Sequence, residues 1–114
     1  MVKKFLFLFI LFINCIVGQN KNIFYVASWN VENLFDTLDD KTKDDNEFLP
    51  ESDKNWNHEK YNLKINNLTK VISDMNDKQG PDLLGLIEVE NINVVEDLLK
   101  NINKTNNKSY KIVH

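Results

Sequence analysis

The chain has 114 residues, with 14 basic and 17 acidic side chains and a formal net charge of −3 at pH 7. This length allows at most one domain. Every basic residue is a lysine, and the sequence has no basic stretch of the kind that binds duplex nucleic acid non-specifically. A phosphate group would therefore have to be met through a metal ion or by residues outside these 114.

Residues 1–18 are predicted to form a secretory signal peptide. Two lysines give a positive start, residues 5–13 form an unbroken apolar run, and Gly18 offers a cleavage point. The run is shorter than the roughly 20 residues that span a bilayer, so we expect no stable membrane span. The protein is expected to be exported, periplasmic or extracellular, and this is favoured over lipid attachment at Cys15.

Cleavage after Gly18 would change the chemistry open to the mature chain. Loss of two lysines changes the net charge from −3 to about −5. The single cysteine would also be lost, which excludes disulfides and thiolate zinc sites. Residues 19–22 are predicted to be a short linker, and residues 23–114 one domain.

The first part of this domain predicts a strand followed by a loop. Residues 23–29 are rich in aromatic and branched side chains, which indicates a strand covered on both faces. Residues 36–53 hold eight acidic and two basic side chains without an apolar period, which predicts a solvated loop. Calcium binding is disfavoured there, because residues 40–51 lack the central glycine and ligand spacing of a calcium loop.

A helix is predicted next, with an apolar stripe from Tyr61 to Met75, an Asn57 cap and a stop at residues 79–81. Residues 83–87 are almost wholly apolar and predict a central strand.

A second helix is predicted to begin at an Asn93 cap, with Glu96 in capping-box position. Its predicted buried stripe consists of Val95, Leu98, Leu99 and Ile102. Residues 110–114 predict a third strand. The order β-α-β-α-β indicates a layered α/β fold, and ending within a strand suggests a fragment of a larger domain.

The polar residues at two strand ends carry the functional prediction. Asn30 follows the first strand and Glu88 follows the strand of residues 83–87. Carboxylate and carboxamide oxygens at neighbouring strand ends are hard ligands of the kind that Mg²⁺ or Mn²⁺ prefers. Each residue alone has a simpler interpretation, a backbone contact for Asn30 and a salt bridge for Glu88.

Residues 29–35 (WNVENLF) and 81–90 (PDLLGLIEVE) resemble the two N-terminal motifs of the endonuclease/exonuclease/phosphatase superfamily, which includes DNase I-like nucleases. Two further segments resemble its secreted bacterial members, YNLK at residues 61–64 and VEN at residues 89–91. The resemblance covers residues 23–114. It implies a partial four-layer α/β sandwich of the DNase I-like type.

The resemblance also implies roles for three residues. Glu88 matches the metal-binding glutamate, Asn30 the asparagine that helps hold metal and phosphate, and Glu32 an acidic position that joins the metal shell in some members. Glu88 and Asn30 are thus the expected catalytic residues, with Mg²⁺ or Mn²⁺ as cofactor. The expected function is that of an exported, metal-dependent phosphodiesterase or nuclease, with nucleic acid as the favoured substrate.

The chain departs from the family pattern after Glu88. The superfamily's Asp-x-Asn and Asp-His pairs have no match after Glu88, so these residues alone are expected to be inactive. Two alternatives stay open: an inactive remnant or binding protein, and a phosphoesterase for phospholipids or inositol phosphates. The sequence does not indicate an oligomeric state.

Overall fold

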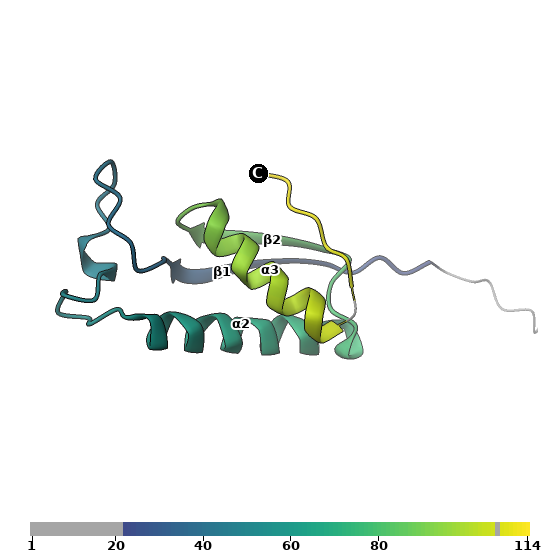
Figure 1. The fold of residues 1–114 in the computed structure, drawn as a ribbon. Helices are drawn as coiled ribbons and strands as arrows, with labels where there is room; N and C mark the ends of the chain where they lie inside the picture. The colour runs from purple at the N-terminus through teal and green to yellow at the C-terminus, as the bar shows by residue number, and fades with distance from the viewer. Residues whose placement is uncertain (1–21, 107) are drawn as a thin grey trace, which may run out of the picture.

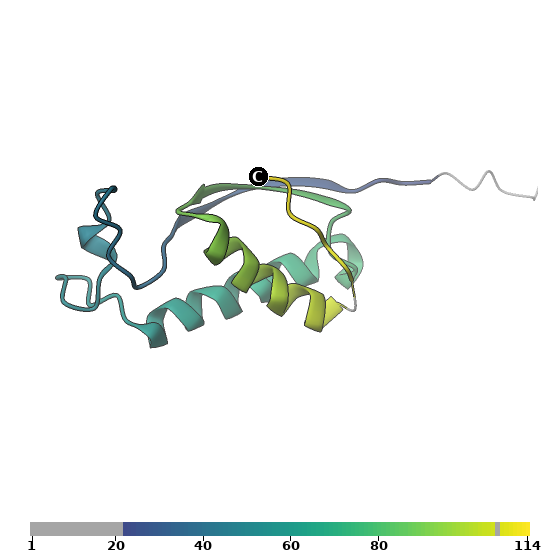
Figure 2. The ribbon, with the colours of Figure 1, turned by 45° about the horizontal axis from the view of Figure 1, so that its top comes forward.

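A computed structural model describes residues 22–106 and 108–114, so the predicted signal peptide lies outside the described residues. The elements are strand β1 (Val26–Leu34), a short 3-10 helix η1 (Asn46–Phe48), helix α2 (His58–Lys78), strand β2 (Leu83–Val89) and helix α3 (Ile92–Asn106). Figure 1 shows their order, and Figure 2 shows both α-helices on one side of the two strands. The predicted α/β class is confirmed.

The core lies between the two helices and the inner side of the strands. Helix α2 buries residues at helical spacing from Tyr61 to Ile72, and α3 buries Val94, Leu98 and Ile102 in the same way. Fully burying one Leu or Ile side chain stabilises a fold by about 1.5–3 kcal/mol. The buried cluster consists of Val31, Leu34, Tyr61, Ile65, Leu68, Ile72, Val94, Leu98 and Ile102.

The two strands are covered on one face only, which corrects the prediction of strands buried on both faces. Leu84 and Leu86 of β2 pack against the core. The alternate residues point the other way, and Val26, Leu83 and Ile87 are 60%, 57% and 52% exposed. Side chains alternate between the faces of a strand, so a single layer of helices covers only every second residue.

The strands pair in parallel with an irregularity at the end that carries the polar residues. Asn30 pairs with Ile87 and Leu34 pairs with Val89, so four steps along β1 correspond to two along β2. This bulge lets β1 continue to Leu34, beyond the predicted end at residue 29. Bulges redirect side chains, and here the redirected residues include Glu32.

Helix α2 begins as predicted. The Asn57 side chain accepts a hydrogen bond from the Lys60 N–H at 3.0 Å, which caps the first turn. Regular helical backbone ends at Met75, where the chain turns and the Gly80 N–H donates to the Met75 carbonyl at 2.9 Å. In the described part of the chain, no helix is long and apolar enough to cross a membrane.

Helix α3 begins earlier than predicted. It starts at Ile92, and the cap is Asn91, whose side-chain oxygen accepts from the Val94 N–H at 3.1 Å. The predicted Asn93 cap is therefore wrong. The buried face shifts with the start of the helix, so Val94 is fully buried while Val95 is only partly buried.

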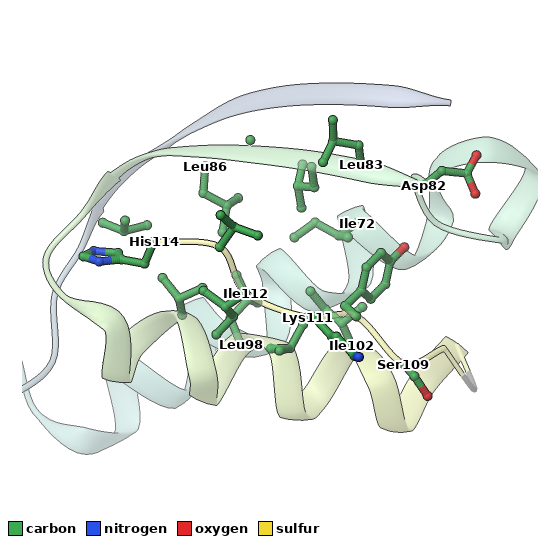
Figure 3. Close-up of a pocket in the computed structure, with 17 residues that line it drawn as sticks. Ile72, Asp82, Leu83, Leu86, Leu98, Ile102, Ser109, Lys111, Ile112 and His114 are labelled. Carbon is green, nitrogen blue, oxygen red and sulfur yellow. The ribbon is translucent and has the colours of Figure 1, made fainter. Parts of the chain in front are cut away.

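Residues 110–114 form no strand, which corrects the third predicted strand. The Tyr110 N–H donates to Asn103 Oδ1 at 2.9 Å, and its hydroxyl donates to the Pro81 carbonyl. The segment borders an apolar cavity of about 560 Å³ between β2 and α3. Figure 3 shows Ile112 of this segment among the residues that line the cavity. Hydrogen bonds of Tyr110 therefore hold the start of this segment, whereas Val113 near its end is fully exposed.

The acidic loop is mostly exposed, but part of it is packed against the rest of the protein. Asp45 is 2% exposed, and one of its oxygens accepts from the Asp40 N–H at 2.9 Å. Phe48, within η1, stacks on Phe35 with ring centroids 4.2 Å apart. The prediction of a wholly solvated loop is wrong, because Asp45 is buried and Phe48 packs against Phe35 at the end of β1.

Candidate functional site

Asn30 and Glu88 lie in direct contact at the ends of the paired strands. Asn30 is in register with Ile87, so Glu88 lies one residue beyond the pairing position. The Asn30 Nδ2 donates a hydrogen bond of 2.5 Å to Glu88 Oε1. Both side chains are exposed, which leaves the pair open to a substrate. The two residues singled out by the sequence thus meet, while their catalytic roles stay predictions.

Glu32 contributes its backbone to this cluster. Its N–H donates to Asn30 Oδ1 at 2.8 Å, and its carbonyl accepts a hydrogen bond from the Lys64 ammonium. The Asn30 amide is therefore held at its oxygen by Glu32 and at its nitrogen by Glu88. These partners define which end of the amide carries the oxygen.

The local backbone is unusual for residues with side chains. Glu32, Asn33 and Glu88 have φ angles of 55°, 61° and 63°, in the left-handed region that favours glycine. Such residues cluster at functional sites, where surrounding contacts hold a conformation that costs about 1–3 kcal/mol per residue. The strain lies on both strands, at the bulge.

Lys64 brings a positive charge from α2 to this strand end. Partial burial lowers the pKa of Lys64, while the carboxylates of Glu32 and Glu88 oppose that shift. The ammonium therefore lies within electrostatic reach of both acidic residues. Sequence reasoning gave Lys64 no role. The signals that could have found it are its place in the YNLK segment and its position three residues after buried Tyr61, at the border of the buried helix face.

The side-chain oxygens at this site are of the type that a hard divalent cation prefers, but the protein offers only a few of them. Among the residues that the structure describes, no three Asp, Glu, His or Cys side chains are grouped to hold a metal ion. Glu88 offers carboxylate oxygens and Asn30 a carboxamide oxygen, and Mg²⁺ binds with few protein ligands because it keeps several waters. Because Asn30 turns its nitrogen to Glu88, joint ligation requires the amide to rotate and release the Glu32 N–H.

A second polar network joins the segments that follow the two strands. The Asp36 N–H donates to Glu90 Oε2 at 3.0 Å, and the Asn91 Nδ2 donates to Asp36 Oδ2 at 3.1 Å. Lys43 donates to the Glu90 carbonyl at 3.2 Å. Burial raises the pKa of Glu90, and the charges of Asp36 and Asp45 add to this shift. Glu90 and Asn91 thus tie the acidic loop to the start of α3.

Glu90→Gln is expected to flatten the pH dependence of stability. The pKa of Glu90 is raised above its ordinary value of 4.5, so the folded state holds this proton more tightly than the unfolded chain. Stability is therefore lost as pH rises from 4.5 through the raised pKa. Glutamine keeps an oxygen to accept from Asp36 but carries no charge. Melting temperatures across about pH 4–7 should fall less steeply than in the wild type.

The matched control is Glu96→Gln, which replaces an exposed carboxylate on α3. It should keep the wild-type slope of melting temperature against pH. A Glu90→Gln profile that overlays the wild type would show that Glu90 ionisation does not affect the stability of this network.

The family comparison covers both strands and both helices. A model of the Endonuclease/Exonuclease/phosphatase family matches residues 25–114. The chain belongs to this family. Members of the endonuclease/exonuclease/phosphatase family are hydrolases that act on phosphodiester-type substrates and generally use divalent metals. The two strands and two helices agree with a partial DNase I-like α/β fold. Searches of curated proteins and of solved structures gave no match.

Proposed function

We propose that the protein is an exported, metal-dependent phosphodiesterase that acts on nucleic acid. The observation that supports this most directly is the contact between Asn30 and Glu88 at 2.5 Å, at adjoining ends of two parallel strands within the family match. In parallel sheets, ligands bind outside the carboxyl ends of the strands. A carboxylate and a carboxamide exposed at this edge are suited to bind a cation and a phosphate.

In this proposal, Glu88 and Asn30 hold Mg²⁺ or Mn²⁺, and Glu32 joins them through its carboxylate. The ion, when bound, would polarise a phosphoryl oxygen and stabilise the leaving alkoxide. Glu88 supplies the charge that the cation needs. Asn30 would orient the cation or the phosphate, because its amide can turn an oxygen to the cation or an N–H to a phosphate oxygen.

The groove beside the pair supports a substrate with a chain of phosphates. A shallow cavity of about 480 Å³ lies between β1 and α2 and includes Asn30, Lys60 and Lys64. The Lys64 ammonium is held by the Glu32 carbonyl, so the exposed Lys60 ammonium is the group that can bind a phosphate flanking a scissile bond. A polynucleotide has such flanking phosphates, whereas a phospholipid head group offers a single phosphodiester.

The test is a metal titration of the full-length gene product after complete chelation. Hydrolysis of single-stranded DNA is expected to be absent without metal and to rise saturably with Mg²⁺ or Mn²⁺, because the donor set needs a dication. Phosphatidylcholine and an inositol phosphate, assayed in parallel, should be poorer substrates. Hydrolysis that survives chelation would contradict metal dependence.

The same titration separates the alternatives. Preferred turnover of the phospholipid or the inositol phosphate would reassign the substrate class but keep the metal chemistry. No turnover of any phosphodiester at saturating metal would favour a non-catalytic protein.

Detection of residues 1–18 in the protein recovered from the cell exterior or periplasm would contradict cleavage of the predicted signal peptide.

A further inference from the structure

Three successive hydrogen bonds connect helix α2 to Glu88. The Lys64 ammonium donates to the Glu32 carbonyl, the Glu32 N–H donates to Asn30 Oδ1, and the Asn30 Nδ2 donates to Glu88 Oε1. Lys64 and Glu32 are 32 positions apart in sequence, and Asn30 and Glu88 are 58 apart. The connection is therefore tertiary. A displacement at its helical end changes the constraint on the carboxylate at its other end.

The central link of this connection needs external support. Glu32 and Asn33 both have left-handed backbone, with φ angles of 55° and 61°, although neither is a glycine. Two adjacent residues in this conformation are costly, and they persist only where other contacts hold them. The neighbouring Val31 and Leu34 are buried and anchor the two flanks of the bulge. Lys64 holds the strained peptide group between those anchors.

The position of the Lys64 ammonium differs from that of an ordinary surface lysine. The side chain is partly buried, and its ammonium approaches a backbone carbonyl instead of pointing into solvent. Lys60, one turn earlier on the same helix, is exposed and donates to the Lys54 carbonyl at 2.6 Å. Both lysines border the same groove. Lys60 is thus a matched control for charge without the connection to the strand ends.

We propose that Lys64 is a positioning residue for the Asn30–Glu88 pair. By holding the Glu32 carbonyl, it restrains the backbone of Glu32. The Glu32 N–H, which lies in the preceding peptide group, orients the Asn30 amide, and the amide in turn orients the Glu88 carboxylate. Its catalytic consequence rests on the proposed function. The structural consequence of this role does not depend on the proposed function, because the orientation of Asn30 can be measured without metal or substrate.

The structural test uses nuclear magnetic resonance of the metal-free, full-length protein. In Lys64→Met, the Asn30 side-chain NH₂ signals should move towards averaged values, and the Glu32 amide should exchange faster with solvent. Lys64→Arg keeps a charged donor and should retain both wild-type signatures. Lys60→Met should retain them as well. Lys64→Gln provides a second loss-of-charge variant if methionine prevents folding.

The affinity for Mn²⁺ distinguishes a positioning role of Lys64 from a simple effect of its charge. Removal of a nearby cation alone would tighten Mn²⁺ binding to the carboxylates, whereas loss of positioning weakens it, and substitutions behind a ligand typically cost about 10–100-fold. We expect Lys64→Met to weaken Mn²⁺ binding about tenfold and to lower kcat by a similar factor with KM little changed. Lys64→Arg should restore most of both quantities.

Two results would overturn the inference: wild-type Asn30 and Glu32 signals in Lys64→Met, or tighter Mn²⁺ binding in that variant. A third result, equal effects of Lys60→Met and Lys64→Met on the Asn30 and Glu32 signals and on Mn²⁺ binding, would overturn it as well, because it would assign those effects to charge in the groove. A wild-type protein that neither binds Mn²⁺ nor hydrolyses DNA would refute the proposed function, and the metal-free spectra would still decide the role of Lys64.

Discussion

Glu88→Gln is expected to lower kcat/KM for metal-dependent hydrolysis by about a hundredfold or more. Changes to residues that only support a metal ligand typically cost 10–100-fold, so loss of a ligand charge should cost at least as much. The Glu88 side chain is exposed, and glutamine retains an oxygen that can accept from Asn30. The melting temperature should therefore change little. The measurement is kcat/KM against Mg²⁺ concentration in the full-length protein, with a thermal melt of each variant.

Glu96→Gln is the control, since it removes the same charge from an exposed position on α3. Its activity and its metal dependence should match those of the wild type. Wild-type activity in Glu88→Gln would remove Glu88 from the proposed metal site. A large loss of melting temperature would instead show that Glu88 supports the fold.

Leu34→Ala is expected to destabilise the protein by about 2–5 kcal/mol. Leu34 is 0% exposed at the end of β1, and its carbonyl accepts from the Glu90 N–H at 3.0 Å. Truncation leaves a cavity in the cluster that links β1 to both helices. It also removes one of the two apolar anchors beside the bulge. The free energy of unfolding, measured by denaturant titration of the full-length protein, gives the size of the loss.

Leu63→Ala makes the same change at a side chain that is 59% exposed on α2. Its effect should be within about 0.5 kcal/mol, because a substitution at the surface opens no cavity. Comparable losses in the two variants would mean that the helices and β1 do not share the packed core described above.

The helices were predictable where local signals decide them. The Asn57 cap and the apolar stripe that follows it depend on contacts within a few residues. The cap is confirmed, and so is the stripe except at Val71, which is 46% exposed. The start of α3 was missed because Asn91 and Asn93 are both acceptable caps by sequence, and the path of the chain leaving β2 selects the first. The predicted strand at residues 110–114 failed because β-branched composition does not provide a pairing partner.

The proximity of Asn30 and Glu88 was predictable from the sequence, but the geometry around them was not. Parallel strands place their carboxyl ends at one edge, which is why two polar residues at strand exits indicated a common site. The bulge, the left-handed conformation of Glu32 and the approach of Lys64 depend on the register between distant segments. No sequence signal within a single segment specifies these contacts. The aromatic contact that orders the acidic loop likewise joins Phe35 to Phe48.

The left-handed backbone at Glu32, Asn33 and Glu88 places this site under a stability–activity trade-off. A glycine at Glu32 or Glu88 would relax the backbone and would also remove a side chain of the proposed metal site. Selection for thermal stability alone would therefore tend to erase the constellation.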